Sequence, residues 1–250
     1  MPDLAALMQA VVDAPTEDAP RAAYARAVAA TDPERAELID IQLELVRADR
    51  AHRDTPPELS RRKVILLQKS GARWAADVKP LVDGWVFLRG FVEYVKLDAA
   101  RFLTVAPELY RRAPVLHLDL TGVRPVAREL FQSPHLARIE SLGLLHNGLG
   151  DAEIAALAAS PHLANLRWLE LSNNRIGTAG LEALAASRHL PRLGYVGFAT
   201  NAIPDPTPPH ADEYDATSPV GEELQRKYGP RPWLDARPRW RWPPPRDAVD

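Results

Sequence analysis

Three consecutive segments of this chain share one pattern of residues. They begin at His135, His162 and His189, so the pattern has a constant period of 27 residues. Its consensus is L-x-x-[LI]-x-x-[LV]-x-[LF]-x-x-N-x-[LI], and the asparagine falls at Asn147, Asn174 and Asn201. A fixed period of this length is typical of repeat architectures, in which each unit buries its apolar face only against its neighbours. The repeat therefore predicts a stack of similar units.

Each unit reads as a short strand followed by a helix. Alternate apolar residues point the same way on a strand, and in the three copies they are Leu142 and Leu144, Leu169 and Leu171, and Val196 and Phe198. We expect the asparagine after each strand to be buried at a bend, where its amide satisfies backbone groups of its own unit and the adjacent one. Asp151 and Thr178 are expected to cap the N-terminal ends of the helices that follow.

A weaker copy precedes these three. Leu116 and Leu118 stand 26 residues before Leu142 and Leu144. That offset puts Thr121 at the position of the asparagine. The sequence thus predicts about four units in all.

The N-terminal part is predicted to be helical. Apolar residues recur at helical spacing from Leu4, and aspartates followed by proline mark further starts at Asp18 and Asp32. Another helix is expected over residues 58–70, ending at Gly71. Before the repeats, a strand over 92–97 and a helix over 99–112 are predicted.

The repeats resemble the leucine-rich repeat, in its ribonuclease-inhibitor-like type, and LRWLELSNNRIGTAGLEALAAS is the best copy. The N-terminal run, with D-x-P…D-x-P-R-x-x-Y-A and then D-P-E-R-A-E-L-I-x-x-Q, resembles the repeat-companion domain of large bacterial paralogous families. GARW and LRGFVEYVKL are also similar to that family, but Arg26-Ala27 replaces its usual acidic–aromatic pair. The resemblance implies no activity.

The resemblance to these two families does imply an α/β fold. That fold is a leucine-rich repeat solenoid with parallel strands on the concave face, helices outside and a helical N-terminal cap. The expected organisation is a companion or cap region at residues 1–87, a solenoid at 88–203, and a Pro-, Trp- and Arg-rich tail or cap at 204–250.

Composition limits the function classes. The chain has no cysteine, which removes disulfides, thiolate metal sites and cysteine nucleophiles, and is consistent with a cytoplasmic location. Its formal net charge of −2 argues against bulk nucleic-acid binding. No apolar run approaches the roughly 18 residues of a membrane helix, and the start lacks the basic region of a secretory signal. None of the common phosphate-binding, nucleophile-elbow or zinc-protease motifs occurs, so we expect no cofactor.

The repeating histidines would stand in a column across the stacked units, and imidazoles arranged in this way could bind a metal ion. They are His135, His162 and His189. No carboxylate supplements the column, however, and a duplicated unit repeats its turn residues anyway. We therefore expect no metal there.

The candidate functional surface is the concave strand face. Residues that flank the strand leucines point outward there, and we expect a protein partner to contact His117, Asp119, Ser141, Leu145, Trp168, Glu170, Ser172 and Tyr195. Gly143, Gly197 and Ala199 complete the surface. Trp168 and Tyr195 would be neighbours one repeat apart, and an exposed aromatic pair beside a charge is typical of an interface hot spot. The alternatives are that the C-terminal tail covers the pair, or that it is ordinary surface.

The tail differs from the rest of the chain in composition. Proline makes up 24 of the 250 residues, almost twice the usual ~5 %, and is dense after Pro204. A short helix over 221–228 is expected, and then RPWLDARPRWRWPPPRD, with Trp233, Trp240 and Trp242. This segment is either a strand-like lid on the last repeat, a free partner-binding segment, or an arm for nucleic acid.

The sequence therefore predicts a non-catalytic protein–protein interaction module without cofactor or membrane contact. Neither its partner nor its oligomeric state follows from the sequence. The alternatives are nucleic-acid binding through the Arg/Trp-rich tail, an enzyme of unrecognised type, and a purely structural or regulatory module whose partner is a neighbouring protein in the same pathway.

Overall fold

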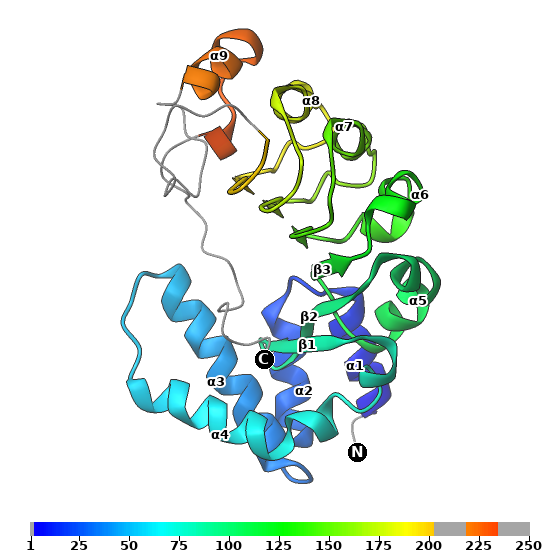
Figure 1. The fold of residues 1–250 in the computed structure, drawn as a ribbon. Helices are drawn as coiled ribbons and strands as arrows, with labels where there is room; N and C mark the ends of the chain where they lie inside the picture. Colours follow the sequence, from blue (N-terminus) through cyan, green and yellow to red (C-terminus); the bar gives the residue numbers. More distant parts are fainter. Residues whose placement is uncertain (1–2, 203–218, 235–250) are drawn as a thin grey trace. The chain divides into compact units, whose positions relative to one another are not determined.

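The computed structural model describes residues 3–202 and 219–234 (Figure 1). They divide into two compact units, the first made of the chain up to Val95 with Pro107–Val115, the second of Lys96–Ala106 and the residues from Leu116 onward. The fold is mixed α/β, with one six-stranded, mostly parallel sheet in sequential order. Its strands are β1 (Gly84–Leu88), β2 (Phe91–Asp98), β3 (His117–Thr121), β4 (Ser141–Gly143), β5 (Trp168–Glu170) and β6 (Tyr195–Gly197).

The described residues contain nine α-helices and four short 3-10 helices. The α-helices are α1 (Leu4–Asp13), α2 (Asp18–Val28), α3 (Pro33–Arg50), α4 (Pro57–Trp74), α5 (Ala99–Arg112), α6 (Ala127–Phe131), α7 (Asp151–Ala158), α8 (Thr178–Ala186) and α9 (Pro219–Tyr228). The 3-10 helices are η1 (Lys79–Leu81), η2 (Arg124–Val126), η3 (Pro134–Leu136) and η4 (Pro232–Leu234).

The first unit begins with four helices, and each packs against the next along the chain. Asp3 and Asp32 cap α1 and α3, because the carboxylate of each accepts hydrogen bonds from N–H groups of the first helical turn. The Asp32 carboxylate, for example, accepts from the Arg35 N–H at 3.1 Å. The core of the bundle is apolar and continues onto β2; it contains Val11, Ala25, Val28, Ile39, Leu43 and Phe91.

The expected end of α4 at Gly71 is wrong, since the helix continues to Trp74. Gly71 does not have the positive φ of a helix-terminating glycine. It is buried, and a Cβ there would stand 3.7 Å from Leu67 and 3.9 Å from Phe87. The glycine therefore serves close packing.

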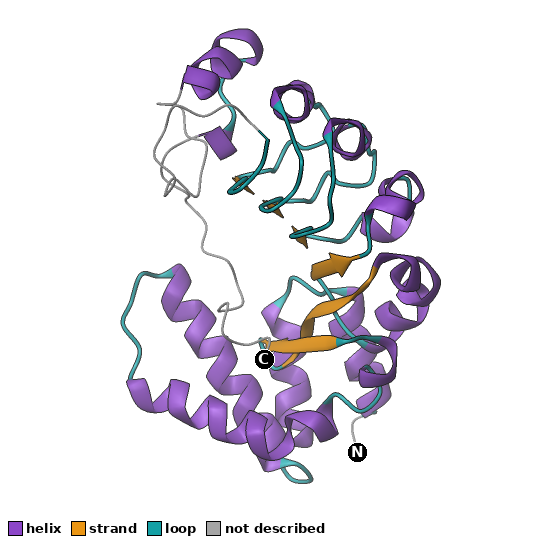
Figure 2. Cartoon of the chain, viewed as in Figure 1, coloured by secondary structure: helices purple, strands orange, loops and turns teal. Residues whose placement is uncertain are grey.

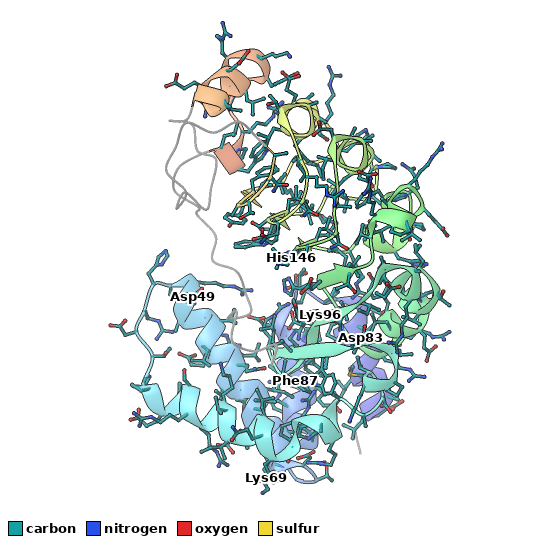
Figure 3. The ribbon with its side chains drawn as sticks, in the orientation of Figure 1. Asp49, Lys69, Asp83, Phe87, Lys96 and His146 are labelled. Atoms are coloured by element: carbon teal, nitrogen blue, oxygen red, sulfur yellow. The ribbon has the colours of Figure 1, made fainter. Side chains whose placement is uncertain are left out.

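Strand β1 was not predicted, and with β2 it forms a hairpin. Arg89 and Gly90 make the two-residue turn with φ of 47° and 85°, the conformation that such hairpins need. A Cβ on Gly90 would lie 2.3 Å from Ile39, so this turn sits directly on α3. The buried Gln42 amide fixes it there: its nitrogen donates to the Phe87 carbonyl at 2.7 Å, and its oxygen accepts from the Gly90 N–H at 2.7 Å (Phe87 is labelled in Figure 3).

In the second unit, strands and helices alternate along the chain. Strands β3 to β6 pair in parallel, and α6, α7 and α8 pack against one another in sequence (Figure 2). The alternate apolar residues of the strands are buried, as predicted: Leu118, Leu120, Leu142, Leu144, Leu169, Leu171, Val196 and Phe198. Helices α7 and α8 begin where expected, but the capping role is wrong: the N-caps are Gly150 and Gly177, and Asp151 and Thr178 are the first helical residues. The Asp151 carboxylate instead accepts hydrogen bonds from the Gly177 and Gly180 N–H groups of the next unit.

The expected offset of the first copy is wrong. Leu118 pairs with Leu142, which is an offset of 24 rather than 26 residues. The register therefore puts Val123, and not Thr121, opposite Asn147. The predicted alignment of the first copy is shifted by two residues because the connection between β3 and β4 is shorter than those in the later units.

Candidate functional site

Three asparagines sit at equivalent bends of the second unit. The most buried is Asn174, whose amide nitrogen donates to the carbonyls of Leu144 and Leu171 at 2.9 and 2.8 Å. Its oxygen accepts from the backbone N–H groups of Asn147 and Leu149 at 3.1 and 3.0 Å. One side chain thus satisfies backbone groups of two neighbouring strand–helix units.

The other two asparagines bond in the same way. Asn147 donates to the Leu120 carbonyl at 2.8 Å and accepts from the Val123 N–H at 2.9 Å. Asn201 donates to the Leu171 carbonyl at 2.9 Å and accepts from the Ile176 N–H at 3.0 Å. These bonds run from each unit to the one before it, and they hold the strands at a fixed spacing.

The residue before each asparagine is in the left-handed region. His146, Asn173 and Thr200 all have φ of 57°, and Gly122 in the first copy has φ of 64° (His146 is labelled in Figure 3). The four bends therefore share one backbone geometry. That geometry starts each connection in the same direction.

The side chains between the strand leucines form a surface that we name the strand face. It consists of the positions at which we expected partner contacts, together with three small residues: His117, Asp119, Ser141, Gly143, Leu145, Trp168, Glu170, Ser172, Tyr195, Gly197 and Ala199. The parallel register arranges those on the strands into rows across the sheet.

The first row carries the rings. His117, Ser141, Trp168 and Tyr195 pair in register from β3 to β6. The His117 Nδ1 lies 2.9 Å from the Ser141 hydroxyl. Trp168 and Tyr195 stack with their ring centroids 3.7 Å apart and their planes 21° from parallel.

The second row alternates carboxylate and glycine. Asp119, Gly143, Glu170 and Gly197 pair in register. A Cβ on Gly143 would lie 3.2 Å from the Asp119 carboxylate, and one on Gly197 would lie 2.5 Å from both Glu170 oxygens. Each carboxylate thus occupies the space above the glycine of the next strand.

The strand face is less exposed than we expected. Trp168 and Tyr195 retain 9 % and 7 % of their surface, so the expectation of an exposed aromatic pair is not met. One physical reason is that each ring covers a face of the other. His117, Ser141 and Ser172 are also buried, Asp119 and Glu170 are half-buried, and Leu145 is exposed.

The described part of the C-terminal region packs on the last strand–helix unit. The Trp233 ring lies 6.3 Å from the Phe198 ring, and Leu224 and Leu234 are buried. The Arg231 Nε donates to the carbonyl of Ala185 at 2.8 Å. Pro232–Leu234 form the short helix η4 here, and not the strand of the lid alternative; the rest of the segment to which that alternative applied lies outside the described residues. Trp240 and Trp242 lie outside the described residues.

The sequence analysis missed a group of buried charges in the first unit. Arg21 and Arg89 both contact the Glu93 carboxylate, at 2.8 and 2.6 Å, and both donate to the Pro15 carbonyl, at 2.6 and 2.8 Å. Burial lowers the pKa of Arg21 to about 10, although Glu93 acts in the opposite direction. The group ties the α1–α2 connection to the β1–β2 turn. No spacing in the sequence pointed to it.

A second buried arginine sits among aromatic rings. The Arg35 guanidinium lies 5.2, 5.1 and 4.9 Å from the ring centroids of Trp74, Phe87 and Phe91. Burial lowers the pKa of Arg35 to about 10. These contacts join α3, α4 and the hairpin, so we assign Arg35 a structural role.

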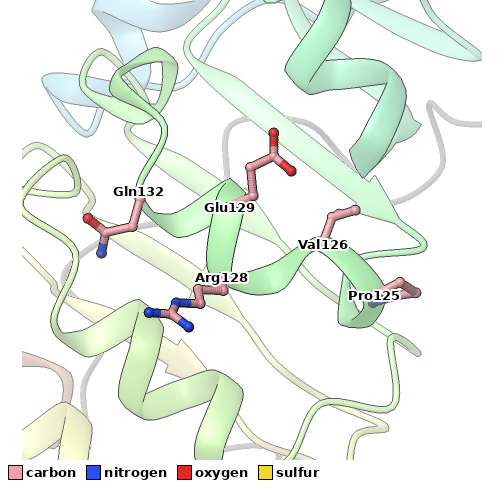
Figure 4. Close-up of a pocket in the computed structure, with 5 residues that line it drawn as sticks. All are labelled: Pro125, Val126, Arg128, Glu129 and Gln132. Carbon is pink, nitrogen blue, oxygen red and sulfur yellow. The ribbon is translucent and has the colours of Figure 1, made fainter.

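A hollow on the surface of α6 is lined by Pro125, Val126, Arg128, Glu129 and Gln132 (Figure 4). It is open to solvent, and the strand face contributes no residue to it. Among the residues described, no group of three His, Cys, Asp or Glu side chains is arranged to hold a metal ion. The helices within residues 3–202 and 219–234 include none that is long and apolar enough to cross a membrane.

Comparison with known proteins returned no match: no family model, no curated protein and no solved structure is similar to this chain.

Proposed function

We propose that the chain is a non-catalytic protein-binding module whose second unit is a leucine-rich repeat solenoid. In this proposal the first unit is a repeat-companion cap, and a protein partner contacts the strand face. The 27-residue pattern, the parallel register and the repeated asparagine bends support the assignment to this repeat class. We also propose a cytoplasmic location, which is consistent with the absence of cysteine.

The observation that carries the proposal is the order of the strand face. Rings and carboxylates are held in rows by strand register and asparagine bends. A surface that is organised before binding loses little conformational entropy when a partner arrives. Only a few strands contribute, so we expect a modest interface.

Nucleic acid fits this surface poorly. The strand face carries two carboxylates and neither lysine nor arginine, whereas nucleic-acid binding depends on cations that neutralise phosphates. We therefore place a protein partner ahead of the nucleic-acid alternative.

The test uses two single variants of the strand face, Leu145→Glu at its exposed residue and Glu170→Lys at a half-buried one. Ala152→Glu, at an exposed position of α7, is the matched control. Proteins retained from an extract of the source organism are quantified by mass spectrometry for each form of the chain, and each candidate is then purified and its affinity measured.

We expect at least one partner to bind the wild type and the control equally. The face variants should bind it roughly tenfold or more weakly, as for the loss of a central interface contact. If every purified partner binds the face variants as tightly as the control, the strand face is not the binding surface.

A further inference from the structure

Most half-buried carboxylates in the described part of the chain have their charge compensated by the chain itself. Many pair with a lysine or arginine, and examples are Asp18, Asp32, Glu34, Glu37, Glu140 and Glu182. Others lie at helix N-termini, where backbone N–H groups take that role, and these are Asp98, Asp151 and Glu153. Compensation of this kind offsets the unfavourable removal of a carboxylate from water.

Glu170 has neither kind of compensation. It is half-buried in strand β5, away from any helix N-terminus, and no lysine, arginine or histidine among residues 3–202 and 219–234 forms an ion pair with it. Its Oε1 accepts one hydrogen bond, from the Ser172 N–H at 2.8 Å. An ionised carboxylate can accept about four hydrogen bonds, so Glu170 can still accept from a cation that arrives at the strand face.

The Glu170 carboxylate is held in one place. A Cβ on Gly197 would lie 2.5 Å from both of its oxygens, so the carboxylate occupies the space that a side chain at Gly197 would fill. The Ser172 N–H fixes Oε1 there. A group that is positioned before binding loses little entropy when a ligand arrives. The planar fork of a guanidinium matches such a carboxylate through two parallel hydrogen bonds, whereas an ammonium is only a point charge.

The residues around Glu170 suit the rest of an arginine side chain. Gly143 and Gly197 flank it on the two adjacent strands, and neither has a side chain that would block an approach. Leu145, which is 39 % exposed, follows Gly143 by two residues, and at the usual strand spacings it is roughly 8 Å from Glu170. The methylene stem of an arginine packs on apolar surface of this kind while its charged end makes hydrogen bonds.

We propose that Glu170 anchors an arginine side chain of the protein partner, with the guanidinium on the carboxylate above Gly197 and the stem against Leu145. The part about a protein partner rests on the proposed function. The assignment adds to that function the chemistry of the contact: the partner presents an exposed arginine, and a lysine at the same place binds more weakly.

An NMR titration of the full, ¹⁵N-labelled chain tests the site without any partner. The Ser172 N–H is a direct reporter, because it donates to the Glu170 carboxylate. The probes are N-acetyl-arginine amide, its lysine counterpart, and its citrulline counterpart, which has nearly the same shape as arginine and no charge. We expect the arginine probe to shift the Ser172 signal to saturation. Lysine should bind several-fold more weakly, and citrulline roughly tenfold or more weakly.

Two variants and their matched controls locate the binding. Glu170→Gln should weaken arginine binding roughly tenfold, whereas Glu140→Gln, at a half-buried carboxylate that pairs with Arg167, should leave it unchanged. Gly197→Ala keeps the charge but forces the carboxylate to move, so it should also weaken binding. Gly194→Ala, where a Cβ would be 3.7 Å from its nearest neighbour, should not.

A Ser172 signal that stays in place with the arginine probe, or that moves as readily with citrulline, would overturn the proposal. Unchanged arginine binding in both Glu170→Gln and Gly197→Ala would do the same. The result is separable from that of the partner experiment. Arginine binding without a strand-face partner would reject the proposed function and keep the arginine site, and a strand-face partner without arginine binding would do the reverse.

Discussion

The two units of this chain differ in how their buried polar groups find hydrogen-bonding partners. The second unit uses one neutral amide three times, at Asn147, Asn174 and Asn201, and each amide serves backbone groups at most 30 residues away in sequence. The first unit uses different groups at single positions: the Gln42 amide at the hairpin turn, and a charged group in which Arg21 reaches the Arg89 carbonyl 68 positions away and Arg89 reaches that of Pro15, 74 away. An interaction that recurs at a fixed period can be recognised in the sequence, whereas an interaction that occurs once cannot.

This difference also predicts how each unit fails. An amide can be removed with loss of a few neutral hydrogen bonds, whereas removing one member of a buried ionic group leaves the others without compensation. Hydrogen exchange followed by mass spectrometry reports on each unit separately. Combined with urea unfolding, it can assign a loss of stability to one unit or the other.

The largest effect should come from Glu93→Gln. Glu93 is 1 % exposed and is the shared partner of Arg21 and Arg89, so the variant removes the carboxylate that pairs with Arg21 and leaves Arg89 with only Asp18, 3.5 Å away. We expect a loss of about 3–5 kcal/mol in the free energy of unfolding of the first unit. Glu58→Gln, which removes an exposed ion pair with Arg61, should cost about 0.5 kcal/mol or less. Comparable losses for the two variants would contradict the contrast between buried and exposed charges.

The next largest effect should come from Asn174→Ala. It leaves the N–H groups of Asn147 and Leu149 and the carbonyl of Leu144 without their side-chain partner, and we expect a loss of roughly 2–3 kcal/mol in the second unit. Faster exchange should appear in β4 and β5 first.

Asn165→Ala is the control for this prediction. Asn165 also bonds to the preceding unit, donating to the Ala137 carbonyl at 2.8 Å, and it accepts from Arg192 at 3.0 Å, but both hydrogen bonds are exposed, so water can replace them. Its loss should cost less than about 1 kcal/mol. If the two asparagine variants are equally stable, burial of the amide at Asn174 is not what holds the bends.

The smallest effect should be a selective loosening of α3 against α4 in acid. A hydrogen bond from Lys69 lowers the pKa of Glu34, and one from Arg62 lowers the pKa of Glu37. Partial burial acts to raise the pKa of Asp32, but hydrogen bonds from Arg73 and Trp74 outweigh it and lower that pKa.

Because these carboxyl pKa values are lower in the folded chain than in the unfolded one, their stabilisation is complete above about pH 5 and is lost as the pH falls through the unfolded and then the folded values. Exchange in α4, corrected for its intrinsic pH dependence, should therefore rise between pH 5 and pH 3 more than exchange in α8. Arg62→Gln should weaken this dependence. An identical pH response of α4 and α8 would contradict the prediction that these carboxylates stabilise α3 against α4.

Much of the second unit could be predicted from the sequence, because its interactions recur with the period of the chain. The alternate apolar residues of the strands, the helix starts at Asp151 and Thr178 and the positions of the asparagines follow from one pattern. The offset predicted for the first copy was wrong, because the connection between β3 and β4 is shorter than the later ones. The repeat period gives no information about a unit whose length differs from it.

The hairpin, the end of α4 and the buried charges could not be predicted in the same way. Strand β1 is specified by a turn at Arg89 and Gly90 that fits only against Ile39 and Gln42, which lie about fifty positions earlier. Alternation picked out strand positions that the structure places in register from β3 to β6. Their burial was not predicted, because exposure depends on what lies over a surface and alternation gives only the direction of each side chain.

The alternation of Asp119, Gly143, Glu170 and Gly197 makes the strand–helix units non-interchangeable, despite their shared pattern. Deleting the unit of β4 would bring two like charges onto neighbouring strands, about 4.8 Å apart. Deleting that of β5 would leave two glycines side by side and remove the Glu170 carboxylate that fills the space above Gly197. A chain of this kind can lengthen or shorten without disturbing its strand face only in steps of two units.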